Sequence, residues 1–398
     1  SFCPRKVGWN PLHRDHDHQM GADMPSMFFY GTLCDLRLCE IVLGRSRDQM
    51  QFSDALLREH AVYCARGENF PLIVREKGSQ AKGLLLEGLG QKDIDRLDYY
   101  ESGFDYAPVK IVVETDAGPK DVNVYYCDDP EVVSGDKWSL ADWSEKWGPT
   151  AYVAAEEFMY HFGKSSASEM DPKFPMMERR AHSWRIAQED PDLGPEAGAA
   201  DRHVEVIEMT RPYTGFFAMR DYRLRYRHFD GSMSAEVSRA AFVSGDASLV
   251  LPYDPETNQI LVLEQFRMAP FARGDKNPWL YEPIAGMIDL GETPESCACR
   301  EAVEEAGLSI SNLIPISKSY PSPGGSTTFF HSFLGICDLK DYTAKIGGLD
   351  DENEDIRPHI MSVDQAIEMA IQGRFRALPL VMMVLWLQQY RQSELVSR

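Results

Sequence analysis

The sequence lacks several features that mark whole classes of protein. None of its eight cysteines forms a CxxC pair, and in a chain of 398 residues such scattered cysteines are typical of reduced thiols. It contains no apolar run of membrane-spanning length, and its first residues hold no apolar core of a secretory signal. A net charge of −21 argues against nonspecific binding to nucleic acid or anionic membrane. We therefore expect a cytoplasmic protein that binds neither.

What the chain does have is enough apolar sequence for real cores. Hydrophobic residues make up 43% of it, and its length predicts two or three domains at about 150 residues each. Shifts in pattern divide it into four parts. We expect a disordered tail over 1–24, a small β-rich domain over 25–130, a helical connector and linker over 131–202, and a larger mixed α/β domain over 203–398.

The most informative stretch runs from Gly286 to Leu308. Thr293 and Pro294 form a helix start, and Gly307 is a natural stop. The expected buried stripe of this helix is Cys299, Ala302, Val303 and Ala306, at i, i+3, i+4 and i+7. Glu301, Glu304 and Glu305 then fall together on the opposite arc.

Two interpretations of this acidic arc compete. Like charges at i, i+4 cost a helix about 0.2–0.5 kcal/mol per pair, so a solvated face, with Arg300 pairing Glu304, is the simpler one. The other is a divalent-cation site, because Mg²⁺ takes one or two carboxylates and completes its shell with water and phosphate oxygens.

The wider spacing favours the cation site. Gly286, five residues, Glu292, seven residues and then the run Arg300–Leu308 resemble the Nudix box, Gx5Ex7REUxEExGU with U apolar, and every defining position is filled. The surrounding segments EQFR, PWLYEPIAGMIDLGE, SPGG and DENEDIR, with RPYTGFF near the start of this half, resemble the ADP-ribose pyrophosphatase branch of that family, to which tellurite-resistance-linked Nudix proteins also belong.

The resemblance implies a Nudix α/β/α sandwich that cleaves ADP-ribose to AMP and ribose 5-phosphate with Mg²⁺, or with Mn²⁺ in its place. It further implies a homodimer formed through strands around Tyr213 to Arg225. The residue roles carried over are Glu301, Glu305 and the Ala285 carbonyl as metal ligands, Glu304 close by, Glu352 as the base, and Arg239 and Arg267 as phosphate and ribose contacts.

Some positions leave alternatives open. Glu354 and Asp355 compete with Glu352 for the role of base. Ser326 to Thr328 stand where the branch often has a glutamate, so contacts to the substrate around that loop can differ. The rival functions are hydrolysis of a nucleotide sugar and a catalytically silent nucleotide sensor.

The domain over 25–130 carries a second set of motifs. Short apolar strands separated by Gly, Asp or Pro surround one amphipathic helix, QKDIDRLDYYES. The loop Tyr30, Gly31, Thr32 and Leu33, together with the LDYYE segment that ends at Glu101, resembles the γ-glutamylcyclotransferase-like family. The resemblance implies a small barrel whose loop holds a γ-glutamyl group while Glu101 moves a proton. A buried glutamate suits that role because burial raises its pKa.

This motif is incomplete. The family commonly continues with tyrosine and then arginine, whereas Phe104 to Pro108 keep a tyrosine and lack the arginine. The alternative is a non-catalytic interaction or dimerisation module. A filled space between Glu101 and the Tyr30–Leu33 loop would exclude catalysis. In the connector we expect one helix from Pro149 and a second over Met176 to Ala187.

Overall fold

The computed structural model describes residues 25–102, 107–126, 133–190, 203–343, 346–348 and 354–397. The chain divides into two compact units, Ser1–Leu140 and Ala141–Arg398. The predicted tail over 1–24 lies outside the described residues, and the domain boundaries proposed from sequence stay predictions. Among the described cysteines, Cys34, Cys39, Cys64, Cys297, Cys299 and Cys337 are free thiols. No helix in the described part is long and apolar enough to cross a membrane.

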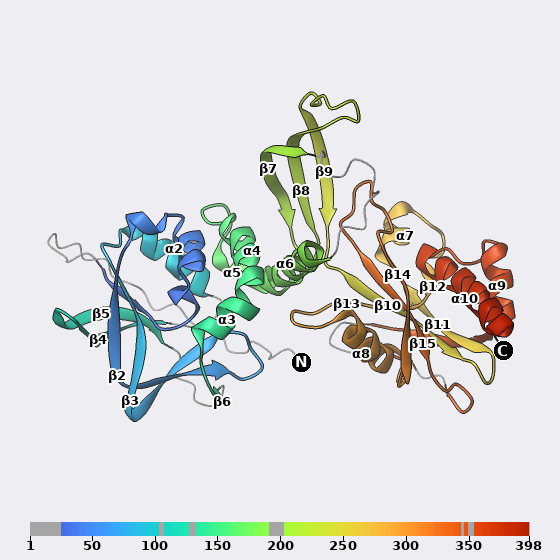
Figure 1. Cartoon of the computed structure of the whole chain (residues 1–398), viewed down its shortest axis with the longest axis horizontal. Coiled ribbons are helices and arrows are strands. Elements are labelled where there is room, and N and C mark those ends of the chain that lie inside the picture. The colour runs from blue at the N-terminus through green and yellow to red at the C-terminus, as the bar shows by residue number, and fades with distance from the viewer. Residues whose placement is uncertain are drawn as a thin grey trace. The chain divides into compact units, whose positions relative to one another are not determined.

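The first unit is built on a closed five-stranded barrel (Figure 1), as the sequence predicted. The order β3-β1-β5-β4-β2 closes through pairing of β2 with β3, and β6 adds to β2. The strands are β1 (Met27–Phe29), β2 (Gln51–Ala65), β3 (Pro71–Glu87), β4 (Ala107–Thr115), β5 (Gly118–Tyr126) and β6 (Val133–Lys137). Phe28, Leu57, Ile73, Leu85 and Val124 belong to its core.

The long β2–β3 hairpin corrects the strand prediction. The sequence predicted short strands separated by Gly, Asp or Pro, but β3 runs without a break from Pro71 to Glu87. Gly78, at a φ of 83°, lies within it, and a register shift opposite, between Arg58 and His60, keeps the two strands paired. The shift leaves Glu59 at a φ of 55°. A bulge of this kind bends a strand without ending it.

The helices of this unit place Glu101. They are η1 (Thr32–Cys34), α1 (Leu36–Leu43), η2 (Arg47–Gln49) and α2 (Gln91–Glu101). Asp35 caps α1 by accepting from the backbone N–H groups of Arg37 and Leu38, each at 3.1 Å. Arg96 of α2 donates to the Val42 carbonyl at the end of α1, which joins the two helices. Glu101 is therefore the last residue of a helix tied to the segment that follows the Tyr30–Leu33 loop.

The second unit begins with the connector helices, α3 (Leu140–Lys146), α4 (Gly148–Met159), α5 (Ala167–Met170), η5 (Asp171–Lys173) and α6 (Phe174–Glu189). Two of them correspond to the helices expected from sequence. Glu157 of α4 and Arg180 of α6 form a buried ion pair at 2.6 Å, and Arg180 also donates to the Gly215 and Phe216 carbonyls. These contacts fix α4 and α6 to the turn after β7.

The core of this unit is a seven-stranded mixed sheet between helices (Figure 1), the predicted α/β/α sandwich. Its path is β12-β11-β10-β15-β14, with β13 paired to β10 and β16 to β11. The strands are β10 (Ala247–Asp254), β11 (Gln259–Phe266), β12 (Trp279–Glu282), β13 (Ile284–Met287), β14 (Asn312–Ser319), β15 (Phe330–Ile336) and β16 (Arg357–Ser362). Helix α8 (Pro294–Ala306) packs on one face, and α9 (Val363–Ile371) and α10 (Leu378–Ser397) pack on the other. The short α7 (Met268–Arg273) follows β11.

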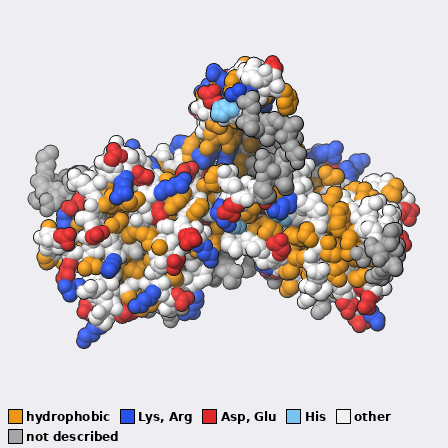
Figure 2. Space-filling view, viewed as in Figure 1, with side chains coloured by type: hydrophobic (Ala, Val, Ile, Leu, Met, Phe, Trp, Pro, Cys, Tyr) orange, Lys and Arg blue, Asp and Glu red, His pale blue; other side chains and the backbone are white. Residues whose placement is uncertain are grey.

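A separate three-stranded antiparallel sheet precedes this core. It consists of β7 (Val204–Thr214), β8 (Ala218–Tyr226) and β9 (Val237–Val243). Large apolar side chains on it and its connections are exposed, and Phe229 is fully so. Figure 2 shows hydrophobic side chains at its surface among charged ones.

Candidate active sites

Helix α8 begins and ends where local sequence dictates. The Thr293 side chain accepts from the Ser296 N–H at 3.1 Å, which satisfies one donor of the first turn. Gly307 ends the helix at a φ of 62°, a conformation that glycine adopts without strain.

The buried face of α8 differs from the predicted stripe. Val303 is 56% exposed, whereas Glu305 is 3% exposed. The face turned into the protein includes Ala298, Ala302 and Ala306. The stripe prediction was confirmed at Ala302 and Ala306 and wrong at Val303, because it assigned burial by apolar residue type and here a carboxylate lies on the buried side. The glutamates consequently do not form a face directed away from the protein core.

Two carboxylates lie over β13. Glu305 accepts a hydrogen bond from the Ala285 N–H at 3.0 Å. A Cβ on Gly286 would lie 1.8 Å from Oε1 of Glu301, so glycine is required for that carboxylate to approach the strand. The first glycine of the predicted box thus makes room for one of its glutamates.

Burial makes this arrangement electrostatically costly. It raises the pKa of Glu301 to about 7 and that of Glu305 well above its ordinary value, and the negative charge of Glu354 raises both further. The positive charge of Arg267 opposes the rise at Glu305. The site therefore gathers acids from α8 and from the segment before β16, with Arg267 near Glu305 and Arg300 beside Glu301.

Arg300 organises the remaining acids of the helix. It donates to both oxygens of Glu292, at 2.9 and 3.0 Å, and to Glu301 and Glu304, at 2.6 and 2.8 Å. It also donates to the Met287 carbonyl at 3.3 Å. The Glu304 pairing anticipated from sequence is present, as one bond of a larger network.

The donors suit a hard divalent cation. Mg²⁺ prefers oxygen ligands and needs only one or two carboxylates from the protein. Glu301 and Glu305 supply them beside the Ala285–Gly286 backbone, in a space that a Cβ would fill. Within the described ranges no group of three or more His, Cys, Asp or Glu side chains is arranged as a metal cage. The fit is thus to an ion that keeps water or substrate oxygens in its shell.

Of the other residues predicted for this site, one lies near the glutamates, one has no contact with them in the described part of the chain, and one lies outside that part. Arg267 donates to Glu282 and lies near Glu305. Arg239 is exposed on β9 and donates to the Ser238 carbonyl at 2.8 Å, and no contact among the described residues joins it to the glutamates. Glu352 lies outside the described residues.

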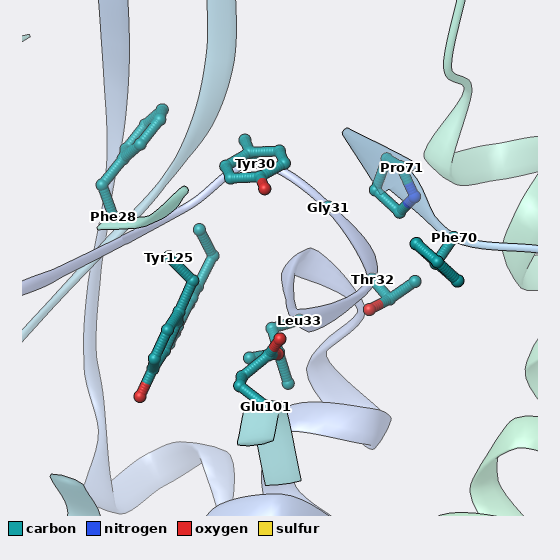
Figure 3. Close-up of a pocket in the computed structure, with 10 residues that line it drawn as sticks. Phe28, Tyr30, Gly31, Thr32, Leu33, Phe70, Pro71, Glu101 and Tyr125 are labelled. Atoms are coloured by element: carbon teal, nitrogen blue, oxygen red, sulfur yellow. The ribbon is translucent and has the colours of Figure 1, made fainter. Parts of the chain in front are cut away.

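In the barrel, Glu101 and the Tyr30–Leu33 loop line one cavity of about 40 Å³. Phe28, Phe70, Pro71 and Tyr125 complete its walls. Figure 3 shows Glu101 extending from α2 toward the loop. The space between them is open, so the obstruction that would exclude catalysis is absent.

Glu101 lies in an apolar setting. It is 7% exposed, and burial raises its pKa to about 8. Beside it the Tyr125 hydroxyl donates to Asp98 at 2.8 Å. Sequence reasoning missed Tyr125, because it lies on a strand that carries no motif. The apolar run VNVYY marks it as part of a strand but cannot show which cavity its side chain lines.

Comparison with known proteins agrees with both halves. Residues 244–381 match the NUDIX domain model, and residues 27–145 match the model described as Gamma-glutamyl cyclotransferase, AIG2-like. The ADP-ribose pyrophosphatase of Escherichia coli (strain K12) is 40% identical over 190 residues, covering 48% of this chain and 90% of that protein. The Haemophilus influenzae ADP-ribose pyrophosphatase is 35% identical, covering 48% and 88%. The GDP-mannose pyrophosphatase of Klebsiella pneumoniae is 30% identical, covering 47% and 92%.

An α/β/α sandwich with an acidic helix over a glycine-bearing strand defines the second unit as a pyrophosphohydrolase. The chain belongs to the Nudix family through this half, and is related there to the ADP-ribose and GDP-mannose pyrophosphatases. Its first half is a domain of the AIG2-like γ-glutamyl cyclotransferase kind. Both family predictions made from sequence are confirmed.

Proposed function

We propose that the Nudix half hydrolyses ADP-ribose to AMP and ribose 5-phosphate with Mg²⁺. The observation that carries this is the pair Glu301 and Glu305, buried over the Ala285–Gly286 backbone with Arg267 in electrostatic range. The 40% identity with an ADP-ribose pyrophosphatase supports the choice of substrate over a GDP-sugar, for which the identity is 30%.

Each group has a defined task in this reaction. Mg²⁺ held by Glu301, Glu305 and the Ala285 carbonyl would offset negative charge that develops on the nonbridging phosphate oxygens. Arg267 binds a phosphate through its planar guanidinium fork, exchanging Glu282 for the substrate. A loop acid takes a proton from the attacking water. The water oxygen bonds to one phosphorus as the bond from that phosphorus to the bridging oxygen breaks.

Glu352 and Glu354 are the candidates for that acid, with Asp355 as a third. Glu354 lies close enough to Glu301 and Glu305 to affect the pKa of each, which supports a place for it beside the metal ligands. Glu352→Gln and Glu354→Gln distinguish the two roles. Loss of the base lowers kcat by about 10²–10⁴-fold at saturating Mg²⁺, whereas loss of an auxiliary ligand raises the Mg²⁺ concentration needed for half-maximal rate.

The substrate is tested with purified protein, Mg²⁺ and matched concentrations of ADP-ribose, GDP-mannose and a UDP-sugar, with a chelator as control. We expect AMP release from ADP-ribose at the highest kcat/KM and no turnover with chelator. A higher kcat/KM for a nucleotide sugar would replace the proposed substrate, and no turnover of any of them would favour a nucleotide sensor.

We propose a second activity for the barrel, formation of 5-oxoproline from a γ-glutamyl amide. The open cavity between Glu101 and the Tyr30–Leu33 loop supports it. Glu101 accepts a proton from the substrate α-ammonium, and the amine nitrogen attacks the γ-carbonyl carbon and gives up a second proton. The departing amine takes up both protons and leaves as an ammonium as the amide C–N bond breaks. No water is consumed. Release of 5-oxoproline from a panel of γ-glutamyl amides tests this activity, and none from any of them would favour an interaction module.

We also propose a homodimer through the three-stranded sheet, with each copy covering the other's exposed apolar side chains. Val204, Val206 and Phe229 are among them, at 58%, 55% and 104% exposure. Large exposed apolar side chains gathered on one sheet are typical of an interface. The mass in solution by light scattering tests this, with Val206→Glu as the disrupting variant. A monomeric wild-type protein would contradict it.

A further inference from the structure

A second cavity adjoins the Glu101 cavity in the barrel and has no part in the chemistry described so far. It measures about 570 Å³, against about 40 Å³ for the Glu101 cavity. Its lining includes Tyr30, Cys34, Lys82, Lys137, Trp138 and Leu140.

The two cavities share a wall. Tyr30 lines both. Cys34 of the larger cavity follows directly on the loop that lines the smaller one, and Leu84 of the larger pairs in the sheet with Phe29 of the smaller. Gly83 allows this closeness, because a Cβ there would lie 2.0 Å from the Phe29 carbonyl oxygen.

The smaller cavity cannot hold a whole substrate. One water molecule needs about 10–15 Å³ by the same measure, so 40 Å³ is too little to enclose a whole γ-glutamyl amide. A γ-glutamyl amide whose reacting carbonyl lies beside Glu101 must therefore extend its amine half into another space. The larger cavity is next to the loop and has the volume for it.

The lining of the larger cavity defines the kind of amine. Ala61, Val62, Ala81, Leu84 and Leu140 contribute apolar surface that suits an alkyl chain. Lys82 of β3 and Lys137 of β6 are the charged residues of its lining, and both are exposed. Among the ion pairs of the described residues neither lysine appears, which leaves both able to bind an anion.

One acid lies near this pair of lysines. Glu76 is close enough to Lys137 to feel its charge, but the Glu76 carboxylate already accepts hydrogen bonds from Tyr63 and Ser79. Lys82 has no such acidic neighbour among the pairs described. The positive charge of the cavity is therefore only partly offset from within.

We propose that the larger cavity binds the amine half of a γ-glutamyl amide, and that Lys82 and Lys137 select amines that carry a carboxylate. The inference rests on the cyclotransferase activity proposed above for the barrel. It assigns Lys82 and Lys137 to substrate specificity, apart from the proton transfer assigned to Glu101.

The test uses two amides that differ only at the far end of the amine chain, which is a carboxylate in one and a methyl group in the other. One is γ-glutamyl-4-aminobutyrate and the other is γ-glutamyl-butylamide. Wild-type protein is expected to form 5-oxoproline from the first with the lower KM. Lys82→Met and Lys137→Met keep the side-chain length and remove the charge, and each should raise the KM for the first amide about two- to fivefold. In the same variants the KM for the second amide should change by less than twofold.

The control is Lys92→Met, which removes an exposed charge from α2 outside either cavity. It should leave both KM values unchanged, and 0.5 M salt should reduce the wild-type preference. Equal KM values for the two amides in the wild type, or equal changes for both in the lysine variants, would overturn the assignment.

Failure of the cyclotransferase activity itself gives a different result. In that case no 5-oxoproline forms from either amide, and calorimetry measures binding of the same two amides to the intact chain. Preferential binding of the carboxylate-bearing amide that Lys82→Met and Lys137→Met weaken would support the cavity assignment without catalysis. Absence of binding would overturn both proposals.

Discussion

The two halves of the chain bury glutamates in contrasting ways. At Glu101 burial alone raises the pKa, to about 8. At Glu305 burial is joined by the negative charges of Glu301 and Glu354, and the Ala285 N–H and Arg267 oppose them. One site thus holds a single proton in an apolar setting, and the other concentrates several negative charges in one place.

That difference separates two kinds of chemistry. A lone carboxyl with a pKa near the working pH is suited to accept and return a proton. In a cluster of buried carboxylates, mutual repulsion prevents all of them from ionising together. A divalent cation offsets that repulsion with its charge, so such a cluster is suited to bind one. In the roles proposed above, the same residue type serves proton transfer in the barrel and metal binding in the sandwich.

The sharpest test exchanges one carboxylate at each site. Glu305→Gln should lower ADP-ribose hydrolysis by about 10³-fold, because a metal ion contributes several kcal/mol to the transition state, and leave 5-oxoproline formation unchanged. Glu101→Gln should do the reverse, with a loss of about 10²–10⁴-fold. Both rates are measured on both variants. Full hydrolysis by Glu305→Gln would refute the metal assignment.

Stability against pH tests the lone carboxyl in the absence of substrate. The folded-state pKa of Glu101, about 8, lies above the unfolded value near 4.3, so the unfolded chain loses this proton first. The contribution of Glu101 to stability is then greatest below pH 4 and is lost as pH rises toward 8. Glu101→Gln abolishes that loss and should raise the free energy of unfolding by roughly 2–4 kcal/mol more at pH 8 than at pH 5. Denaturant unfolding at the two pH values measures it.

The control for this prediction is Asp116→Asn, in the exposed turn between β4 and β5. An exposed surface substitution changes stability by less than about 0.5 kcal/mol. If Glu101→Gln raised the free energy of unfolding equally at pH 5 and pH 8, the carboxyl of Glu101 would not be held neutral by burial.

Sequence predicted the parts of this molecule that depend on neighbours along the chain. The limits of α8 follow from Thr293 and Gly307, and the spacing of the box is the spacing of residues on one helix and the strand before it. The two families followed from the same local spacing. Most strands of the barrel were also visible, but the first ten residues of β2, with their mixed polar pattern, were not.

What sequence could not give depends on distant contacts. The helix periodicity predicted one buried stripe that included Val303, and only the packing of α8 on β13 decides that Glu305 is buried and Val303 exposed. Tyr125 lines the Glu101 cavity from β5, a strand that is distant in sequence from both motifs but pairs with β1 in the barrel. The proposed role of Arg239 needs contacts beyond those that the described chain provides.

Gly286 offers a smaller test of the metal site. In Gly286→Ala the new Cβ would meet Oε1 of Glu301 at 1.8 Å and displace that carboxylate. Overpacking of this kind costs about 1–3 kcal/mol, so we expect about a tenfold loss of hydrolysis together with a raised Mg²⁺ requirement. Glu301→Asp in the same chain shortens the side chain and should recover part of the loss. Additive losses in the double variant would show that the two residues do not act through this contact.

The smallest effect is expected at Tyr125. Its hydroxyl donates to Asp98 and keeps lone pairs that can accept a hydrogen bond, and Tyr125 lines the cavity beside Glu101, where the substrate ammonium would lie. Tyr125→Phe removes that acceptor and should raise the KM for a γ-glutamyl amide about three- to tenfold, the range for one hydrogen bond to a charged group. The kcat should change little, because Glu101 still moves the proton. A fall in kcat as large as that of Glu101→Gln would instead place Tyr125 in the proton transfer. The barrel would then resemble the sandwich, where several side chains and not one make up the site.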